Sequence, residues 1–118
     1  MRWEYCAKSW ASVALRIPGM RYGLHGHDVE VEACIESGKV VDVEEVARSL
    51  EEAVSSVDYK PLWEALGRGE ALIEDLLIHV LDKLQARGYK VTIIKATLPR
   101  GRVIKLKPGN QPATTRGG

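Results

Sequence analysis

The chain has 118 residues, a formal net charge of +1 and 28% charged residues, a length that fits one domain with a modest core. This balance excludes a global electrostatic attraction to nucleic acid or to an anionic membrane. No stretch reaches the ~18 apolar residues that span a bilayer, and the first residues lack an apolar leader, so we expect a cytoplasmic protein.

The first half of the chain predicts two strands and a helix. Residues 1–17 are rich in Trp, Tyr and Val and predict a long strand. Residues 28–36 alternate apolar and polar side chains, which predicts a half-buried antiparallel strand. A helix is expected to begin at Asp42, which has capping-box spacing to Glu45, and to continue through an apolar repeat to Val57.

The second half predicts a helix and a hairpin. A short helical piece is expected around residues 62–66, and a second long helix over about residues 71–86, ended by Gly88. Residues 89–97 and 102–107 predict a β-hairpin. The order β-β-α-α-β-β gives an α+β fold, with a four-stranded antiparallel sheet and two helices on one of its faces.

Two features of composition bear on source and chemistry. The only amide residues are Asn110, Gln85 and Gln111, and this depletion of thermolabile side chains predicts a thermophilic source. Cys6 and Cys34 do not have the spacing of a metal knot, so neither a disulfide framework nor a structural zinc site is expected.

The sharpest local motif is a pair of histidines. His25 and His27 stand at i and i+2, so on a strand their rings share one face and can converge on a metal ion; the same positions also fit hydrogen-bonded core histidines. An alternating strand follows, then residues 38–42 (GKVVD), a helix, and residues 57–62 (VDYKPL). This order resembles the 6-pyruvoyl- and 6-carboxy-tetrahydropterin synthase family over about residues 1–107.

The resemblance implies the T-fold, in which subunits join their sheets into a barrel and place active sites between subunits. We therefore expect a homo-oligomer, either a ring or a dimer of rings. The resemblance also implies a zinc cofactor and a pterin- or purine-like ligand, which in the family is dihydroneopterin triphosphate. Residues 108–118 lie beyond the family domain of residues 1–107 and lack an apolar anchor, so a disordered tail is expected there.

The resemblance assigns roles to individual residues. His25 and His27 match two metal ligands of the family, whereas the third ligand, expected near position 14 or 15, is not a histidine here. Asp58 and Tyr59 match the catalytic Asp-His pair. A tyrosine relays protons but is a weaker base than histidine, because its pKa is ordinarily near ~10.

The substrate-binding residues implied by the resemblance are Arg21, Glu74 and Thr97. Arg21 stands where the family has its catalytic cysteine, and a guanidinium can grip a triphosphate but is neither a base nor a nucleophile near neutral pH. Ala96 replaces the glutamate that anchors the pterin ring.

The positions at which this sequence matches the family motifs are mostly structural, whereas the family residues that it lacks are mostly those that carry out the chemistry. This division predicts a divergent tetrahydropterin synthase-like protein in which standard catalysis is impaired or lost. Two alternatives stay open: an active zinc-dependent lyase with altered residues, and a purely structural or partner-binding T-fold oligomer. The large aromatic residues are expected to serve packing, in the core or at subunit contacts; they are Trp3, Trp10 and Trp63.

Overall fold

The computed structural model describes residues 1–15, 25–58, 60–67 and 71–109. The elements follow in the order β1 (Trp3–Leu15), β2 (His25–Ser37), α1 (Val43–Ser55), β3 (Lys60–Pro61), α2 (Leu62–Ala65), α3 (Ile73–Ala86), β4 (Lys90–Leu98), a 3-10 turn (Pro99–Gly101) and β5 (Arg102–Leu106). Most of the expected tail, residues 110–118, lies outside the described residues.

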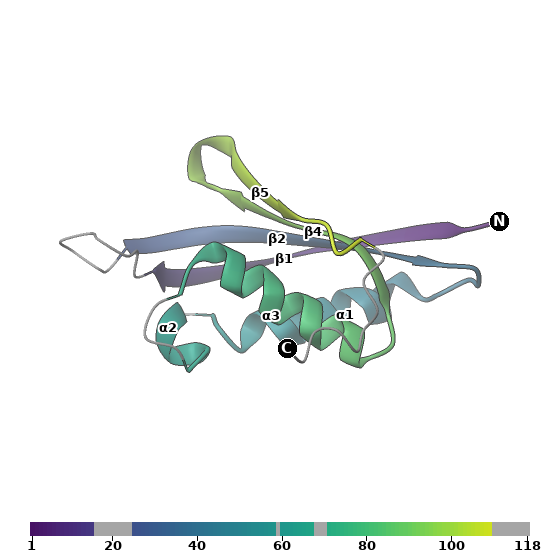
Figure 1. Ribbon diagram of the computed structural model, residues 1–118, viewed down its shortest axis with the longest axis horizontal. Coiled ribbons are helices and arrows are strands. Elements are labelled where there is room, and N and C mark those ends of the chain that lie inside the picture. The colour runs from purple at the N-terminus through teal and green to yellow at the C-terminus, as the bar shows by residue number, and fades with distance from the viewer. Residues whose placement is uncertain (16–24, 59, 68–70, 110–118) are drawn as a thin grey trace.

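All strands form one sheet in the order β3-β1-β2-β4-β5. The pairs β1–β2, β2–β4 and β4–β5 are antiparallel, which confirms the expected four-stranded antiparallel sheet. The two-residue strand β3 adds a short parallel pairing at the outer edge of β1. Both long helices, α1 and α3, lie on the same face of the sheet (Figure 1), so the architecture has two layers.

The two faces of the sheet differ in chemistry because β1 and β2 alternate along their length. On the helix-facing side, Val29 and Val31 are fully buried, while Asp28, Glu30 and Glu32 point to the opposite side, here called the outer face. The core lies between the helix-facing side and the two helices, and its largest buried side chains are Ile35, Leu50, Leu76, Leu77, Leu84 and Ile94.

Local signals define the ends of the long helices. The Asp42 side chain accepts a hydrogen bond from the Glu44 backbone N–H at 3.0 Å and thereby caps α1. In the expected capping box, the Asp42 side chain would accept from the backbone N–H of Glu45. In the structure that N–H donates to the Asp42 backbone carbonyl at 3.0 Å. Helix α3 ends before Gly88, whose φ of 88° lies in the left-handed region that glycine adopts without strain.

Two tryptophan side chains of β1 are exposed: Trp10 lies on the outer face, whereas Trp3 falls on the same side of the strand as Tyr5 and Ala11. Trp10 is 64% and Trp3 is 46% exposed, so neither packs in the core of this chain. No helix in the described part of the chain is both long and apolar enough to cross a membrane.

Candidate functional site

Two motifs that are distant in the sequence flank the same end of β1. In the sheet register, Val13 lies opposite His27 on β2, and Leu15 lies opposite His25. On its other side, Val13 pairs in parallel with Lys60 of β3, which follows the Asp58-Tyr59 pair. The fold therefore brings the histidine motif and the Asp58 segment to either side of one strand.

A cavity of about 280 Å³ lies beside this end of β1. The described residues that line it are Trp10, Ala11, Ser12, Asp28 and Asp58. The cavity thus combines two carboxylates, a hydroxyl and an exposed indole. This is a small set of polar groups next to a flat apolar surface, an arrangement that can orient a planar polar ligand.

Ser12 connects the two carboxylates of the cavity. Its hydroxyl donates to Asp28 Oδ1 at 2.5 Å, and its backbone N–H donates to Asp58 Oδ1 at 2.8 Å. Because the Ser12 N–H points away from β2, Ser12 and Asp28 form a non-hydrogen-bonded pair of the antiparallel ladder, in which opposing side chains approach most closely. The Asp58 carboxylate in turn satisfies a backbone donor at the edge of β1.

This arrangement can bind donors of hydrogen bonds. Ser12 engages only the Oδ1 atom of each aspartate, so Asp28 and Asp58 each also present Oδ2, and an ionised carboxylate accepts several hydrogen bonds. N–H groups on the edge of a heterocycle suit such acceptors, and the ring itself can stack on the exposed face of Trp10. Polar and stacking contacts are thus available within one cavity.

Of the residues predicted for catalysis and metal binding, Asp58 lines the cavity. Tyr59 lies outside the described residues, as does Arg21, the predicted triphosphate contact. The backbones of His25 and His27 belong to β2, while their side chains lie outside what the structure describes.

The other two predicted substrate contacts do not line this cavity as described. Glu74 is exposed in the first turn of α3. Thr97 lies on β4 opposite Glu30, and strand β2 separates β4 from β1. Ala96 is fully buried against the core, so the position at which the resemblance places the pterin-anchoring glutamate faces the helices in this chain.

The fit of a family-type zinc site can be judged from the neighbours of the two histidines. Their cross-strand partners on β1, Leu15 and Val13, are hydrocarbons and offer no third ligand. Cys6 lies seven positions before Val13 on the same strand, which at ~3.3 Å per residue is roughly 23 Å away, too far to complete the site. The residues that the structure describes here do not fit a three-ligand catalytic zinc site.

Four residues that line the cavity, Trp10, Ala11, Ser12 and Asp28, were not among the predicted site residues, and Trp10 had been assigned to packing. Asp28 was assigned to the polar side of its strand, which is correct, but its neighbour could not be identified without the register. The alternation on both strands supplies the only available signal, because it places Ser12 and Asp28 on the same face once the strands are paired.

A serine–histidine pair on the helical layer does not form a second active site. Ser56 Oγ lies 3.0 Å from His79 Nε2 but donates its single proton to the Ala53 carbonyl at 2.9 Å. With that proton on the carbonyl, the tautomer of His79 that carries hydrogen on Nε2 donates to Ser56 Oγ, and in this arrangement the ring is not a base for the hydroxyl. Burial, and then the nearby Lys83 charge, hold the pKa of His79 below its ordinary value. We assign this pair to helix packing.

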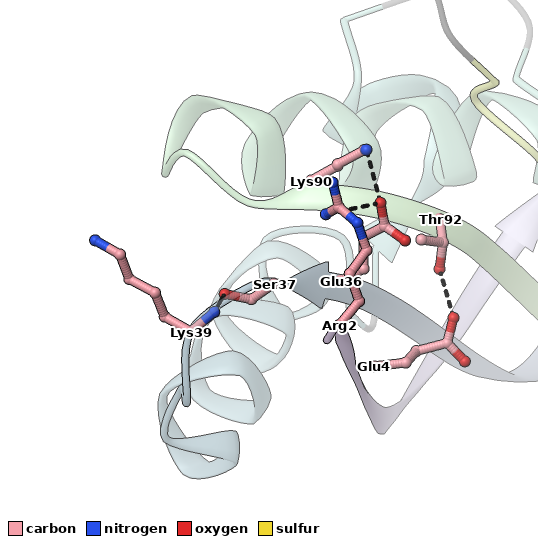
Figure 2. Close-up of polar contacts among 7 residues, drawn as sticks. All are labelled: Arg2, Glu4, Glu36, Ser37, Lys39, Lys90 and Thr92. Carbon is pink, nitrogen blue, oxygen red and sulfur yellow. Dashed lines mark hydrogen bonds and ion pairs between the residues drawn. The ribbon is translucent and has the colours of Figure 1, made fainter.

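At the other end of the sheet, an ion-pair cluster surrounds Glu36. Figure 2 shows the Lys90 and Arg2 side chains approaching its carboxylate, at 2.6 and 3.5 Å from Oε1. The hydrogen bond from Lys90 holds the pKa of Glu36 below its ordinary value against a smaller opposing effect of desolvation. Exposed pairs of this kind contribute little to stability, so the cluster serves mainly to order the strand ends.

Cys6 and Cys34 form a disulfide, which corrects the expectation that no disulfide is present. The two residues lie directly opposite each other on β1 and β2, with Cα atoms 4.1 Å apart. The spacing of cysteines along the chain carried no sign of this pairing, because it depends on the register. In a chain whose composition predicts a thermophilic source, a disulfide does not by itself indicate secretion, since intracellular proteins of hyperthermophiles are rich in disulfides.

Comparison with known proteins bears on the fold. No family model matches the sequence, and no curated protein matches it. The chain is similar to the crystal structure of 6-pyruvoyl tetrahydropterin synthase from Plasmodium vivax, with 12% identity and a TM-score of 0.55 over 91% of this chain and 99% of that chain. The fold is that of a tetrahydropterin synthase. Two catalytic-residue mutants of the same enzyme match over the same shares, with identities of 12% and 11% and TM-scores of 0.48 and 0.44.

Proposed function

We propose that this chain is a divergent relative of the tetrahydropterin synthases that binds a pterin- or purine-type heterocycle and has lost the standard lyase chemistry. The binding site is the cavity lined by Trp10, Ser12, Asp28 and Asp58. The aspartates accept hydrogen bonds from the amino and ring N–H groups of the heterocycle, and Trp10 stacks on its ring.

The observation that carries this proposal is the position of Asp58. The residue was predicted from the family motif, and the fold places its carboxylate in a cavity with a second carboxylate and an exposed indole. Ser12 holds Oδ1 of both aspartates, so their orientation does not depend on the ligand. A preorganised acceptor pair reduces the entropic cost of ordering the site when a ligand binds.

The loss of lyase chemistry follows from the residues that replace the family's reactive groups. Arg21 in place of the cysteine cannot act as a nucleophile or a base. Two histidines with hydrocarbon neighbours on β1 do not supply the three protein ligands of a catalytic zinc site. An active zinc-dependent lyase, in which Asp58 and Tyr59 relay protons, is the alternative that an activity assay must test.

Assembly into a homo-oligomer is part of the proposal. Edge strand β5 pairs only with β4 among the described strands, and Val103 on it is 45% exposed. An unpaired edge of this kind invites strand addition from another copy. Exposed Trp10 on the outer face and exposed Trp3 at the start of β1 then become contacts with a ligand or a second subunit rather than solvent-exposed surface.

Calorimetry with neopterin tests the binding site. Unsubstituted pterin and lumazine are the matched ligand pair, because they share the bicyclic ring and differ in having an amino group or a carbonyl at position 2. We expect neopterin and pterin each to bind more tightly than lumazine. Asp58→Asn and Asp28→Asn should each weaken neopterin binding by roughly tenfold to a hundredfold, because a charge-assisted hydrogen bond contributes about 1.5–3 kcal/mol.

The control variant is Glu51→Gln, an exposed carboxylate on α1 away from the cavity. Asp58→Asn retains an oxygen that can accept the Ser12 N–H, so it separates loss of charge from loss of fold. Equal neopterin affinity in Asp58→Asn and Glu51→Gln would refute the site. Turnover of dihydroneopterin triphosphate by zinc-supplemented protein, abolished in Asp58→Asn, would instead establish the lyase alternative.

A further inference from the structure

A second cluster of reactive side chains lies on the outer face, toward the end of the sheet opposite the cavity. Cys6 is exposed, Cys34 is 6% exposed, and the Glu4 carboxylate lies within 4.8 Å of both sulfur atoms. On β1, Glu4 and Cys6 stand at i and i+2 and so share the outer face. Neither the family resemblance nor the proposed heterocycle site uses these three side chains.

The backbone holds the two cysteines together whether or not their sulfurs are bonded. Their neighbours in the register, Tyr5 with Ile35 and Ala7 with Ala33, pair without interruption on both sides. The carbonyl of Cys34 is directed to β4, where it accepts from Thr92, so Cys6 and Cys34 form a non-hydrogen-bonded pair. Side chains of such pairs lie close together, and reduction therefore leaves two adjacent thiols.

A β-bulge supports the third member of the cluster. Cys34 pairs with Ile93 and Ile35 pairs with Val91, so Thr92 is an extra residue on β4 with no partner of its own. The Thr92 hydroxyl lies 3.2 Å from Glu4 Oε2 (Figure 2) and also 3.2 Å from the Cys34 carbonyl, so it is within donating distance of both acceptors. The bulge thus orients the Glu4 carboxylate beside the sulfurs.

Two thiolates and a carboxylate form a coherent ligand set for a thiophilic cation. Zinc binds cysteine sulfur at about 2.3 Å and carboxylate oxygen at about 2.0–2.2 Å, and it leaves the fourth tetrahedral position open when three protein ligands are present. Tetrahedral geometry at that bond length separates the sulfurs by roughly 3.8 Å, which side-chain rotation provides once the disulfide is broken. The cluster contains no imidazole, so it is chemically distinct from the predicted histidine site.

We propose that Cys6, Cys34 and Glu4 form a redox-gated metal site that is a disulfide when oxidised and binds zinc when reduced. A dithiol reductant attacks the exposed Cys6 sulfur, the Cys34 thiolate leaves, and the second thiol of the reductant displaces Cys6. The reductant is oxidised to its own disulfide as the protein gains two thiols. Zinc then displaces the two thiol protons and binds both sulfurs and the Glu4 carboxylate.

Cobalt titration of the full chain under anaerobic conditions tests this proposal. After reduction with a phosphine and removal of the reductant, we expect one Co²⁺ per chain, with the near-ultraviolet absorption of thiolate-to-cobalt charge transfer. Zinc should displace the cobalt and abolish the band. Diamide-oxidised protein should show no band, and two thiols per chain should titrate only in the reduced form.

Variants identify the ligands. Cys6→Ser should abolish the charge-transfer band, Glu4→Gln should weaken cobalt binding at least tenfold, and Thr92→Val should weaken it about tenfold as a residue that orients a ligand. The double variant His25→Ala/His27→Ala should keep the band. Because Cys6 is exposed, its variant should fold as the reduced parent does, as circular dichroism can verify. Absence of the band in reduced parent protein, or its loss in the histidine variant alone, would overturn the proposal.

Discussion

Reduction of the Cys6–Cys34 disulfide should lower the thermal unfolding midpoint by about 15 °C in metal-free protein. The disulfide joins residues 28 positions apart, and the loop it closes restricts the unfolded chain by about 3.6 kcal/mol in the chain-entropy treatment. At about 2.1 cal/mol/K per residue, the 118 residues give an unfolding entropy of roughly 250 cal/mol/K. The ratio of these two quantities sets the expected shift.

Circular dichroism melts with a chelator present provide the assay. The matched variant is Cys6→Ser/Cys34→Ala, which removes both sulfurs and places no hydroxyl at the buried position 34. Its midpoint should equal that of the reduced parent and should not respond to reductant. An unchanged midpoint in parent protein that titrates two thiols per chain after reduction would refute the chain-entropy argument. So would a drop in the midpoint of the double variant, on addition of reductant, that equals the drop in the parent.

Three further predictions concern the fold. Leu50→Ala should lower the free energy of unfolding by about 2–5 kcal/mol in chemical denaturation, because Leu50 is fully buried between α1 and the sheet. Asp42→Ala should cost about 1 kcal/mol in the same assay through loss of the α1 cap, and Asp42→Asn should restore most of it. The pKa of Glu36 lies below its ordinary 4.5 in the folded state, so its contribution to stability is complete above that pH and is lost as the pH falls through the folded-state pKa. Lys90→Gln should raise the Glu36 pKa in a carboxyl NMR titration; an unchanged value would contradict the assigned cause.

The elements were predictable where a periodic signal runs along the chain. Strand β2 was expected from its alternation, and α1 from its apolar repeat and from Asp42, whose side chain does cap the helix. The short helix α2 was also expected at nearly its observed position. These are local properties, so a single sequence is sufficient to reveal them.

The cavity and the disulfide depend on pairing between strands, which no local signal defines. Ser12 meets Asp28, and Cys6 meets Cys34, only because β1 and β2 pair in one particular register. A shift of one residue would move every side chain of a strand to the opposite face. Only one member of the cavity, Asp58, was identified beforehand, and it came from a family motif rather than from periodicity.

The bulge at Thr92 also has a consequence for how β4 tolerates changes in length. The side chains of Val91 and Ile94 face the core, whereas those of Lys90, Ile93 and Lys95 lie on the outer face. Without Thr92, buried and outward-facing side chains would therefore alternate regularly along β4. A chain shortened by that single residue should keep the phase of both halves of the strand. Such a one-residue deletion would remove the support for Glu4 while leaving the hydrophobic layer in place.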